Sequence, residues 1–154
     1  FVGSRGLGDV YKRQVLKDNV FSFKKINQYQ DFNQFEEEYI IINKVGFLSK
    51  LYAQSTIAYV GGGFSKSGIH NIIEPAAASN PVIFGSNFMN SNKSDAEGLI
   101  DVSGGFSVDS YELFTEKINW LLDKNNYNNS SKNCKSFVSE NSGSTEKILK
   151  ELYE

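Results

Sequence analysis

The chain has 154 residues, of which 40% are hydrophobic and 22% are charged, so it is long enough for one globular domain with a real core. Its formal net charge of -2 gives no electrostatic basis for binding nucleic acid, because nucleic-acid-binding proteins usually carry a basic face. The longest apolar run, residues 57–60, is far too short to cross a bilayer.

The chain begins with a segment that we expect to lie outside the fold. Residues 4–14 read SRGLGDVYKRQ and resemble the translation of a sequencing-library adapter, which appears at the broken ends of gene fragments. The alternative is a genuine basic loop whose glycines and cations, such as Lys12 and Arg13, contact phosphates. We interpret residues 1–14 as an adapter artefact and residues 15–154 as one domain. Because an adapter marks a cut gene, we also expect an upstream domain to be missing.

Strands and helices are expected to alternate along residues 15–154, because β-branched and aromatic runs predict strands and apolar residues at helical spacing predict helices. In chain order, the expected strands are 20–23, 39–42, 57–60, 82–84 and 104–108, and the expected helices are 46–54, 71–79, 94–100, 110–122, 131–140 and 144–153. Residues 24–37 are expected to form a loop or weak helix, and the Asn-rich residues 125–131 a polar loop. The alternation predicts an α/β fold, a parallel sheet flanked by helices. The segments after Ile42, Val60 and Phe84 should then lie at the ligand-binding edge.

The most informative segment is residues 61–75, GGGFSKSGIHNIIEP. Three glycines directly after a buried strand allow a tight turn and the close approach of a ligand. Gly68 is expected to open the next helix, whose free N–H groups and dipole favour a phosphate, and Pro75 suits a first helical turn. Asn71 can cap this helix or bind a ligand, and we infer that the Glu74 carboxylate accepts hydrogen bonds from a ribose.

A less specific interpretation of the same segment stays open, in which a Gly-rich turn merely connects a strand to a capped helix. Composition alone favours that interpretation, because glycine spacing by itself is weak evidence. The segment is neither the GxGxxG of dinucleotide folds nor a Walker P-loop, since no GK[ST] follows. The residues by themselves therefore indicate an anion or nucleotide site on an α/β domain.

Residues 61–75 are similar to the pattern of the 3-deoxy-D-manno-octulosonic acid (Kdo) transferases, a Gly-Gly pair and a short variable loop followed by G-[GI]-H-N-x-[LI]-E. Upstream, residues 45–52 (VGFLSKLY) resemble the x-G-x-L-x-x-L-Y helix of this family. Downstream, residues 81–88 (PVIFGSNF) resemble its P-V-I-x-G-P-x-x strand and loop. The similarity covers residues 39–153, and the ordered combination of motifs is specific although each motif alone is not.

The resemblance implies the Rossmann-like C-terminal domain of a GT-B glycosyltransferase that transfers Kdo from CMP-Kdo to lipid A precursor in lipopolysaccharide biosynthesis. It implies a cytoplasmic enzyme at the inner face of the inner membrane. The missing N-terminal half would supply the catalytic base, the acceptor surface and membrane association, so this chain alone is expected to be inactive. We expect no cofactor, no metal and no nucleic-acid partner. Matching the motifs residue by residue assigns the nucleotide to Val45, Gly46, Phe47, Asn71, Ile72, Ile73 and Glu74, with possible donor contacts at Gly62, Gly63, Gly68 and His70.

Some positions depart from the family pattern. Phe47 stands where many members have Glu, Ser86 replaces a usual proline, and Ser55 and Thr56 stand where Ala-Asp is common. These departures affect the detailed contacts more than the resemblance. Two alternatives stay open, namely another GT-B transferase that uses a UDP-sugar, and a non-catalytic nucleotide-binding module or interaction domain.

Several single residues have two interpretations each. His70 either caps or packs beside the helix start, or donates to a phosphate or sugar. Lys66 is expected to be solvated, although it is also placed to steer an anionic donor. Trp120 is expected in the core. Cys134 is expected to be a passive thiol, and a lone cysteine fits a reducing compartment such as the cytoplasm.

Overall fold

The computed structural model describes residues 23–26, 39–42, 45–46, 48–65, 68–89 and 92–143. The chain divides into two compact units, Phe1–Leu48 and Ser49–Glu154, each of which is described by itself. Several predictions lie outside the described residues: the adapter segment 1–14, Phe47, Lys66 and the helix expected at 144–153.

The first unit contains a parallel pair of strands, β1 (Phe23–Ile26) and β2 (Tyr39–Ile42). β2 forms over the residues predicted from its β-branched run. β1 begins at the last residue of the strand expected at 20–23 and continues through Lys24 and Lys25, which we expected in a loop. The loop or weak helix predicted from residue 24 is therefore wrong for these two lysines. Edge strands commonly carry lysines, and both strands of a two-stranded sheet are edges.

Three strands form the sheet of the second unit, in the order β3 (Ala58–Val60), β4 (Val82–Gly85) and β5 (Gly105–Val108). Both pairings are parallel, with Val82 opposite Ala58 on one side and opposite Gly105 on the other. The helices α3 (Ile73–Ala77) and α4 (Lys93–Asp101) supply the crossovers that parallel strands require. The predicted α/β fold with a parallel sheet is therefore confirmed.

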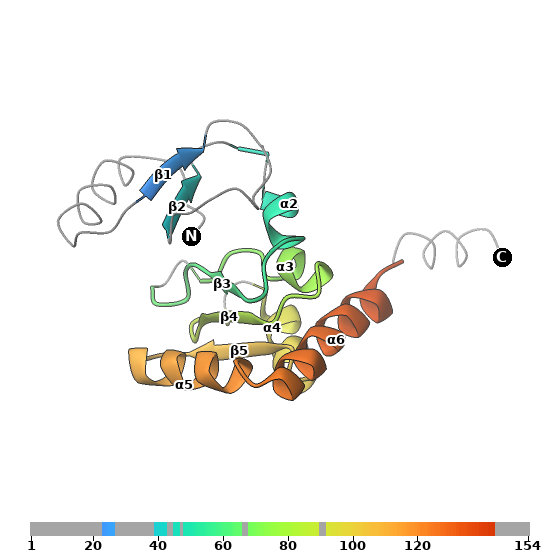
Figure 1. Cartoon of the computed structure of the whole chain (residues 1–154). Coiled ribbons are helices and arrows are strands. Elements are labelled where there is room, and N and C mark those ends of the chain that lie inside the picture. Colours follow the sequence, from blue (N-terminus) through green and yellow to red (C-terminus); the bar gives the residue numbers. More distant parts are fainter. Residues whose placement is uncertain are drawn as a thin grey trace. The chain divides into compact units, whose positions relative to one another are not determined.

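The sheet is buried on both faces, and β4 is its fully buried middle strand. Successive strand residues alternate in direction, so Val82 and Phe84 belong to one hydrophobic cluster and Ile83 to another. The first cluster includes residues of α3, α4 and α6 (Lys124–Asn141), and the second includes Leu121 of α5 (Tyr111–Leu121). Figure 1 shows these helices around the sheet. Helices on both faces explain why β4 reads as a continuous apolar run.

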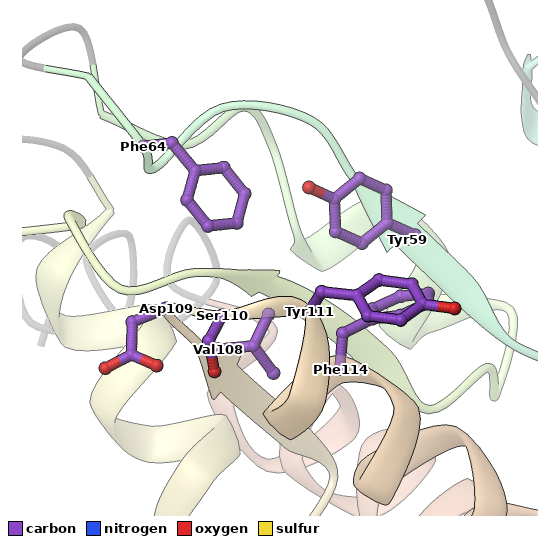
Figure 2. Close-up of a pocket in the computed structure, with 7 residues that line it drawn as sticks. All are labelled: Tyr59, Phe64, Val108, Asp109, Ser110, Tyr111 and Phe114. Carbon is purple, nitrogen blue, oxygen red and sulfur yellow. The ribbon is translucent and has the colours of Figure 1, made fainter.

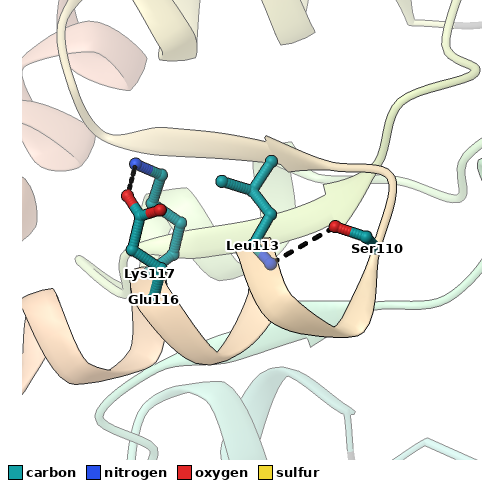
Figure 3. Close-up of polar contacts among 4 residues, drawn as sticks. All are labelled: Ser110, Leu113, Glu116 and Lys117. Carbon is teal, nitrogen blue, oxygen red and sulfur yellow. Dashed lines mark hydrogen bonds and ion pairs between the residues drawn. The ribbon is translucent and has the colours of Figure 1, made fainter.

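α5 confirms the amphipathic helix predicted for residues 110–122. The Ser110 Oγ accepts a hydrogen bond from the Leu113 N–H at 3.3 Å and so caps the first turn (Figure 3). Figure 3 also shows the exposed ion pair between Glu116 and Lys117, at 2.8 Å, which contributes little to stability. Trp120 is 40% exposed and packs against the Phe106 ring, with centroids 5.5 Å apart. Its predicted place in the core is wrong, because it lies at the core's edge.

The helix α6 begins at Lys124, so the polar loop expected at 125–131 is wrong. Asp123 caps this helix, because its Oδ1 accepts hydrogen bonds from the Asn125 and Asn126 N–H groups at 2.9 and 3.0 Å. Ser130 is buried and donates to the Ser103 carbonyl at 2.8 Å. Capping and tertiary contacts thus outweigh the weak helix propensity of asparagine.

The buried Asn80 connects the short helix α2 (Leu48–Tyr52) to the start of β4. Its Nδ2 donates to the Tyr52 carbonyl at 2.7 Å and to the Ser55 Oγ at 2.9 Å. α2 and α3 are both shorter than the helices predicted for residues 46–54 and 71–79. Among the described residues, no helix is long and apolar enough to cross a membrane.

Candidate functional site at the carboxyl edge of the sheet

The segment after β3 folds back on itself instead of opening a helix. Gly62 and Ile69 form an antiparallel bridge, the Gly63 N–H donates to the Gly68 carbonyl at 2.8 Å, and the His70 N–H donates to the Gly61 carbonyl at 3.3 Å. The prediction that Gly68 opens the next helix is therefore wrong, since α3 begins at Ile73. The physical reason is that two stretches of backbone satisfy each other's hydrogen bonds across the loop.

The glycines of this loop allow backbone to approach backbone. Gly63 has φ +79°, and a Cβ added to it would lie 2.6 Å from the Gly85 carbonyl oxygen at the end of β4. Gly62 has φ +95°, and its added Cβ would collide with the Gly68 carbonyl oxygen. Gly63 and Gly68 are buried, and the Gly63 N–H is already bonded within the loop. For these residues the geometry supports the connecting-turn interpretation, and the donor contacts stay predictions.

Two asparagines that the sequence analysis did not single out hold the loop in place. The Asn87 N–H donates to the Gly63 carbonyl at 2.8 Å, and its Nδ2 donates to the Ser65 carbonyl at 2.7 Å. The Asn92 Nδ2 lies 3.4 Å from the Ile69 carbonyl oxygen and 3.3 Å from that of His70. The sequence signal was present, because asparagines that follow a strand at the ligand-binding edge suit loop contacts.

Asn71 and Glu74 form an exposed pair at the start of α3. The Asn71 Oδ1 accepts a hydrogen bond from the Ile73 N–H at 2.9 Å, and the Asn71 Nδ2 donates to the Glu74 Oε1 at 3.0 Å. The Asn71 side chain lies one residue before the N-cap, Ile72, where it satisfies the first N–H of the helix and orients the Glu74 carboxylate. Burial, and secondarily the Glu74 charge, raise the pKa of the Tyr52 hydroxyl.

The other residues assigned to the nucleotide differ in exposure. Ile72 is completely buried in the core and Ile73 is half-buried, so only backbone groups of Ile72 are left to meet a ligand. In the first unit, Val45 is 72% exposed, and Gly46 has φ +87° with open space around its Cβ position. His70 is exposed at the end of the loop. These assignments stay predictions.

A pocket that the sequence analysis missed lies at the same edge of the sheet. Its volume is about 390 Å³. Most of its walls are aromatic rings (Figure 2). The lining residues come from β3, the loop after it, the end of β5 and the start of α5: Tyr59, Phe64, Val108, Asp109, Ser110, Tyr111 and Phe114. An available signal was that Phe64 and Tyr111 follow closely after the strands β3 and β5.

Cys134 is the passive thiol that was predicted. It is buried in the first cluster, and its Sγ lies 3.1 Å from the Gly104 carbonyl oxygen. Burial raises the pKa of the Cys134 thiol to about 12, so very little reactive thiolate is present near neutral pH. The described part of the chain contains no group of three or more His, Cys, Asp or Glu residues that could hold a metal ion.

The sequence is similar to several known proteins, although no protein-family model matches it. It is 31% identical over 128 residues to a bifunctional glycosyltransferase/methyltransferase of Fusobacterium nucleatum, covering 82% of this chain and 19% of that protein. It is 31% identical over 118 residues to the 3-deoxy-D-manno-octulosonic acid transferase of Rickettsia bellii, covering 75% and 27%. The enzyme of the same name from Chlamydophila psittaci is 34% identical over 90 residues, covering 57% and 20%.

The fold is also similar to a solved structure, the C-terminal CMP-Kdo binding domain of WaaA from Acinetobacter baumannii. The TM-score is 0.70 at 17% identity, and the match covers 84% of this chain and 67% of that one. The chain spans only about a fifth to a quarter of the length of the curated relatives named above. The chain is similar in sequence to part of the 3-deoxy-D-manno-octulosonic acid transferases and has the Rossmann-like fold of the C-terminal domain of these GT-B enzymes.

Proposed function

We propose that this chain is the CMP-Kdo-binding half of an enzyme that transfers Kdo to lipid A precursor in lipopolysaccharide biosynthesis. The observation that carries the proposal is the exposed Asn71–Glu74 pair at the carboxyl edge of the sheet, in a chain whose relatives are Kdo transferases. Parallel sheets of this class bind ligands at that edge. The proposal includes the domain layout, an adapter remnant at 1–14 followed by the binding domain at 15–154.

The Asn71–Glu74 pair suits a ribose better than a phosphate. An amide hydrogen bond at 3.0 Å fixes one carboxylate oxygen, so the group is oriented before a ligand arrives. A carboxylate accepts hydrogen bonds from neutral hydroxyls and repels phosphate. We therefore assign the ribose to Glu74, while Asn71 acts through it as a positioning residue. Backbone groups of Ile72 and Ile73 are proposed to hold more of the nucleotide. For Val45, Gly46 and Phe47, in the first unit, a nucleotide contact is proposed separately, from the motif resemblance alone.

The phosphate needs donors other than the helix start first expected at Gly68. The Gly63 and His70 N–H groups are bonded within the loop, and the Ile73 N–H is bonded to Asn71. The exposed His70 side chain is the donor that we propose from this loop. We further propose that the catalytic base, the acceptor surface and membrane association lie in the other half of the enzyme, at the cytoplasmic face of the inner membrane.

Titration of the ¹⁵N-labelled chain with CMP tests this proposal. The amide signals of Gly46, Asn71, Ile72 and Ile73 are expected to move and saturate, and CMP is expected to outcompete UDP. Glu74→Gln should weaken CMP binding by about fivefold or more, because a charged acceptor forms stronger hydrogen bonds than a neutral one.

Glu112→Gln is the matched control for this experiment. Glu112 is also an exposed first-turn acid, but on α5, so its substitution should leave CMP binding unchanged. Stationary amides at saturating CMP would refute the proposal and favour an interaction domain. Tighter binding of UDP would instead favour a UDP-sugar transferase. Kdo transfer by this chain alone would refute the assignment of the base to the other half.

A further inference from the structure

The aromatic pocket presents unusually exposed rings to solvent. Tyr59 is 45% exposed, Phe64 59% and Tyr111 77%. Tyr59 and Phe114 pack edge to face, with centroids 5.5 Å apart and planes at 85°, so this part of the wall is held by ring packing. Figure 2 shows the Phe64 ring across the opening from Val108, while the Tyr59 ring lies against Phe114. The result is a slot whose sides are ring faces and ring edges.

The charge at this slot limits what it can bind. Asp109 lies at one end (Figure 2), and Glu112 is on the first turn of α5 beside it. None of the described residues that line the slot is a lysine, arginine or histidine. The carboxylates of Asp109 and Glu112 therefore disfavour phosphates and carboxylated sugars at this slot. The Ser110 Oγ already accepts the Leu113 N–H, which leaves the Asp109 carboxylate as the charged acceptor for a ligand's hydroxyl groups.

We propose that this slot binds the neutral pyranose ring of a carbohydrate acceptor. The C–H face of a pyranose is apolar and packs on aromatic rings, while its hydroxyls point to the rim and donate to a carboxylate. A volume of about 390 Å³ falls in the range of small-ligand pockets. The choice of a sugar rests on the proposed glycosyltransferase function, and the choice of a neutral ring rests on Asp109.

The position of the slot supports an acceptor subsite. Phe64 belongs to the same loop that ends in the exposed His70 and Asn71, so one loop borders both the slot and the proposed donor site. This inference places one acceptor contact in the binding half, in addition to the acceptor surface that we proposed for the other half. A hydrocarbon chain and a nucleobase are the competing occupants.

Titration of the full chain, followed by NMR of its tyrosine rings and backbone amides, tests the inference. The probes are a neutral methyl hexopyranoside, glucuronate, CMP and hexanol. We expect the neutral glycoside to shift the signals of Tyr59, Tyr111 and the Asp109 amide in the millimolar range, and glucuronate to bind more weakly. Tyr111→Ala and Asp109→Asn should each weaken glycoside binding by about threefold or more.

Controls separate this inference from loss of fold and from the nucleotide proposal. Leu122→Ala removes another highly exposed apolar side chain, outside the slot, and should leave glycoside binding unchanged. Asp109→Lys should reverse the preference in favour of glucuronate. The inference is overturned if no probe shifts these signals, or if CMP or hexanol shifts them and the glycoside does not. Shifts at Asn71 with CMP report separately on the nucleotide site, so either proposal can fail alone.

Discussion

Substituting Gly63 by alanine distinguishes a glycine needed for folding from one needed for a ligand. At φ +79°, an alanine is strained by about 1–2 kcal/mol. Its methyl group would also lie 2.6 Å from the Gly85 carbonyl oxygen, and relieving such a clash by moving packed backbone costs about 1–3 kcal/mol more. The free energy of unfolding should therefore fall by about 2–5 kcal/mol, a large part of the roughly 5–15 kcal/mol that holds a typical domain together.

Gly61→Ala is the matched control, two residues earlier in the same loop. The nearest atom to its added Cβ is the His70 Cδ2 at 4.0 Å, and its φ lies outside the left-handed region. We expect this substitution to change the free energy of unfolding by no more than about 0.5 kcal/mol. Gly61 is exposed, so a methyl group there would obstruct a ligand that approaches the loop from solvent.

Urea unfolding followed by Trp120 fluorescence measures both effects, because this ring packs on Phe106 within the second unit. Gly63→Ala should lower the midpoint strongly while the slope stays similar. A loss below about 1 kcal/mol for Gly63→Ala, or equal losses for both variants, would refute the role of Gly63 in the close packing of the loop on β4. Weaker CMP binding by a normally folded Gly61→Ala chain would show that a ligand approaches the loop closely.

Two further predictions concern buried groups. Asn80→Ala should lower the free energy of unfolding by about 1–3 kcal/mol, because it removes two hydrogen bonds of a buried amide while the Tyr52 carbonyl keeps its Ser55 donors. A loss below about 0.5 kcal/mol by urea unfolding would contradict this. Burial raises the pKa of Cys134 from 9.0 to about 12. The buried, protonated thiol therefore stabilises the fold fully below pH 9, and this stabilisation is lost as the pH rises towards 12. A thiol reagent at a pH of about 8 should accordingly label the native chain only as fast as it unfolds, and rapid labelling of folded protein would show that the thiol is accessible.

The sequence predicted those elements whose signals are local. The run at β4 is apolar and β-branched because the strand is buried on both faces, and α5 has both an apolar stripe and the capping residue Ser110. The start of α6 could not be predicted in the same way. Its asparagines favour loops by propensity, and the bond from Ser130 to the Ser103 carbonyl that helps to fix the helix joins residues 27 positions apart.

The sequence predicts where a candidate site should lie, but it did not predict the geometry of the loop there. A strand followed by glycines and then by Asn71 and Glu74 was enough to indicate a ligand-binding edge. The fold-back of the loop depends on Asn87 and Asn92, which contact it from more than 20 positions further along the chain. Asparagines after a strand indicate a loop contact, but no local pattern indicates which distant segment they contact. The aromatic slot was missed for the same reason, since the fold brings together Tyr59 and Phe114, which lie far apart in the chain.

The geometry of the loop separates the nucleoside from the phosphate in the proposed site. The Gly68 N–H, where the phosphate-binding helix was expected to open, donates to the Ser65 carbonyl, and nearby backbone N–H groups are also bonded. The oriented carboxylate of Glu74, in contrast, suits a ribose. If this chain contributes mainly the nucleoside contacts, cytidine should move the amides around Asn71 nearly as far as CMP does. Binding of the phosphate would then depend on His70 and on cationic groups of the other half, because the Glu74 carboxylate repels a phosphate that no cation neutralises. A strict requirement for the phosphate would show instead that the loop rearranges and frees its N–H groups when the nucleotide binds.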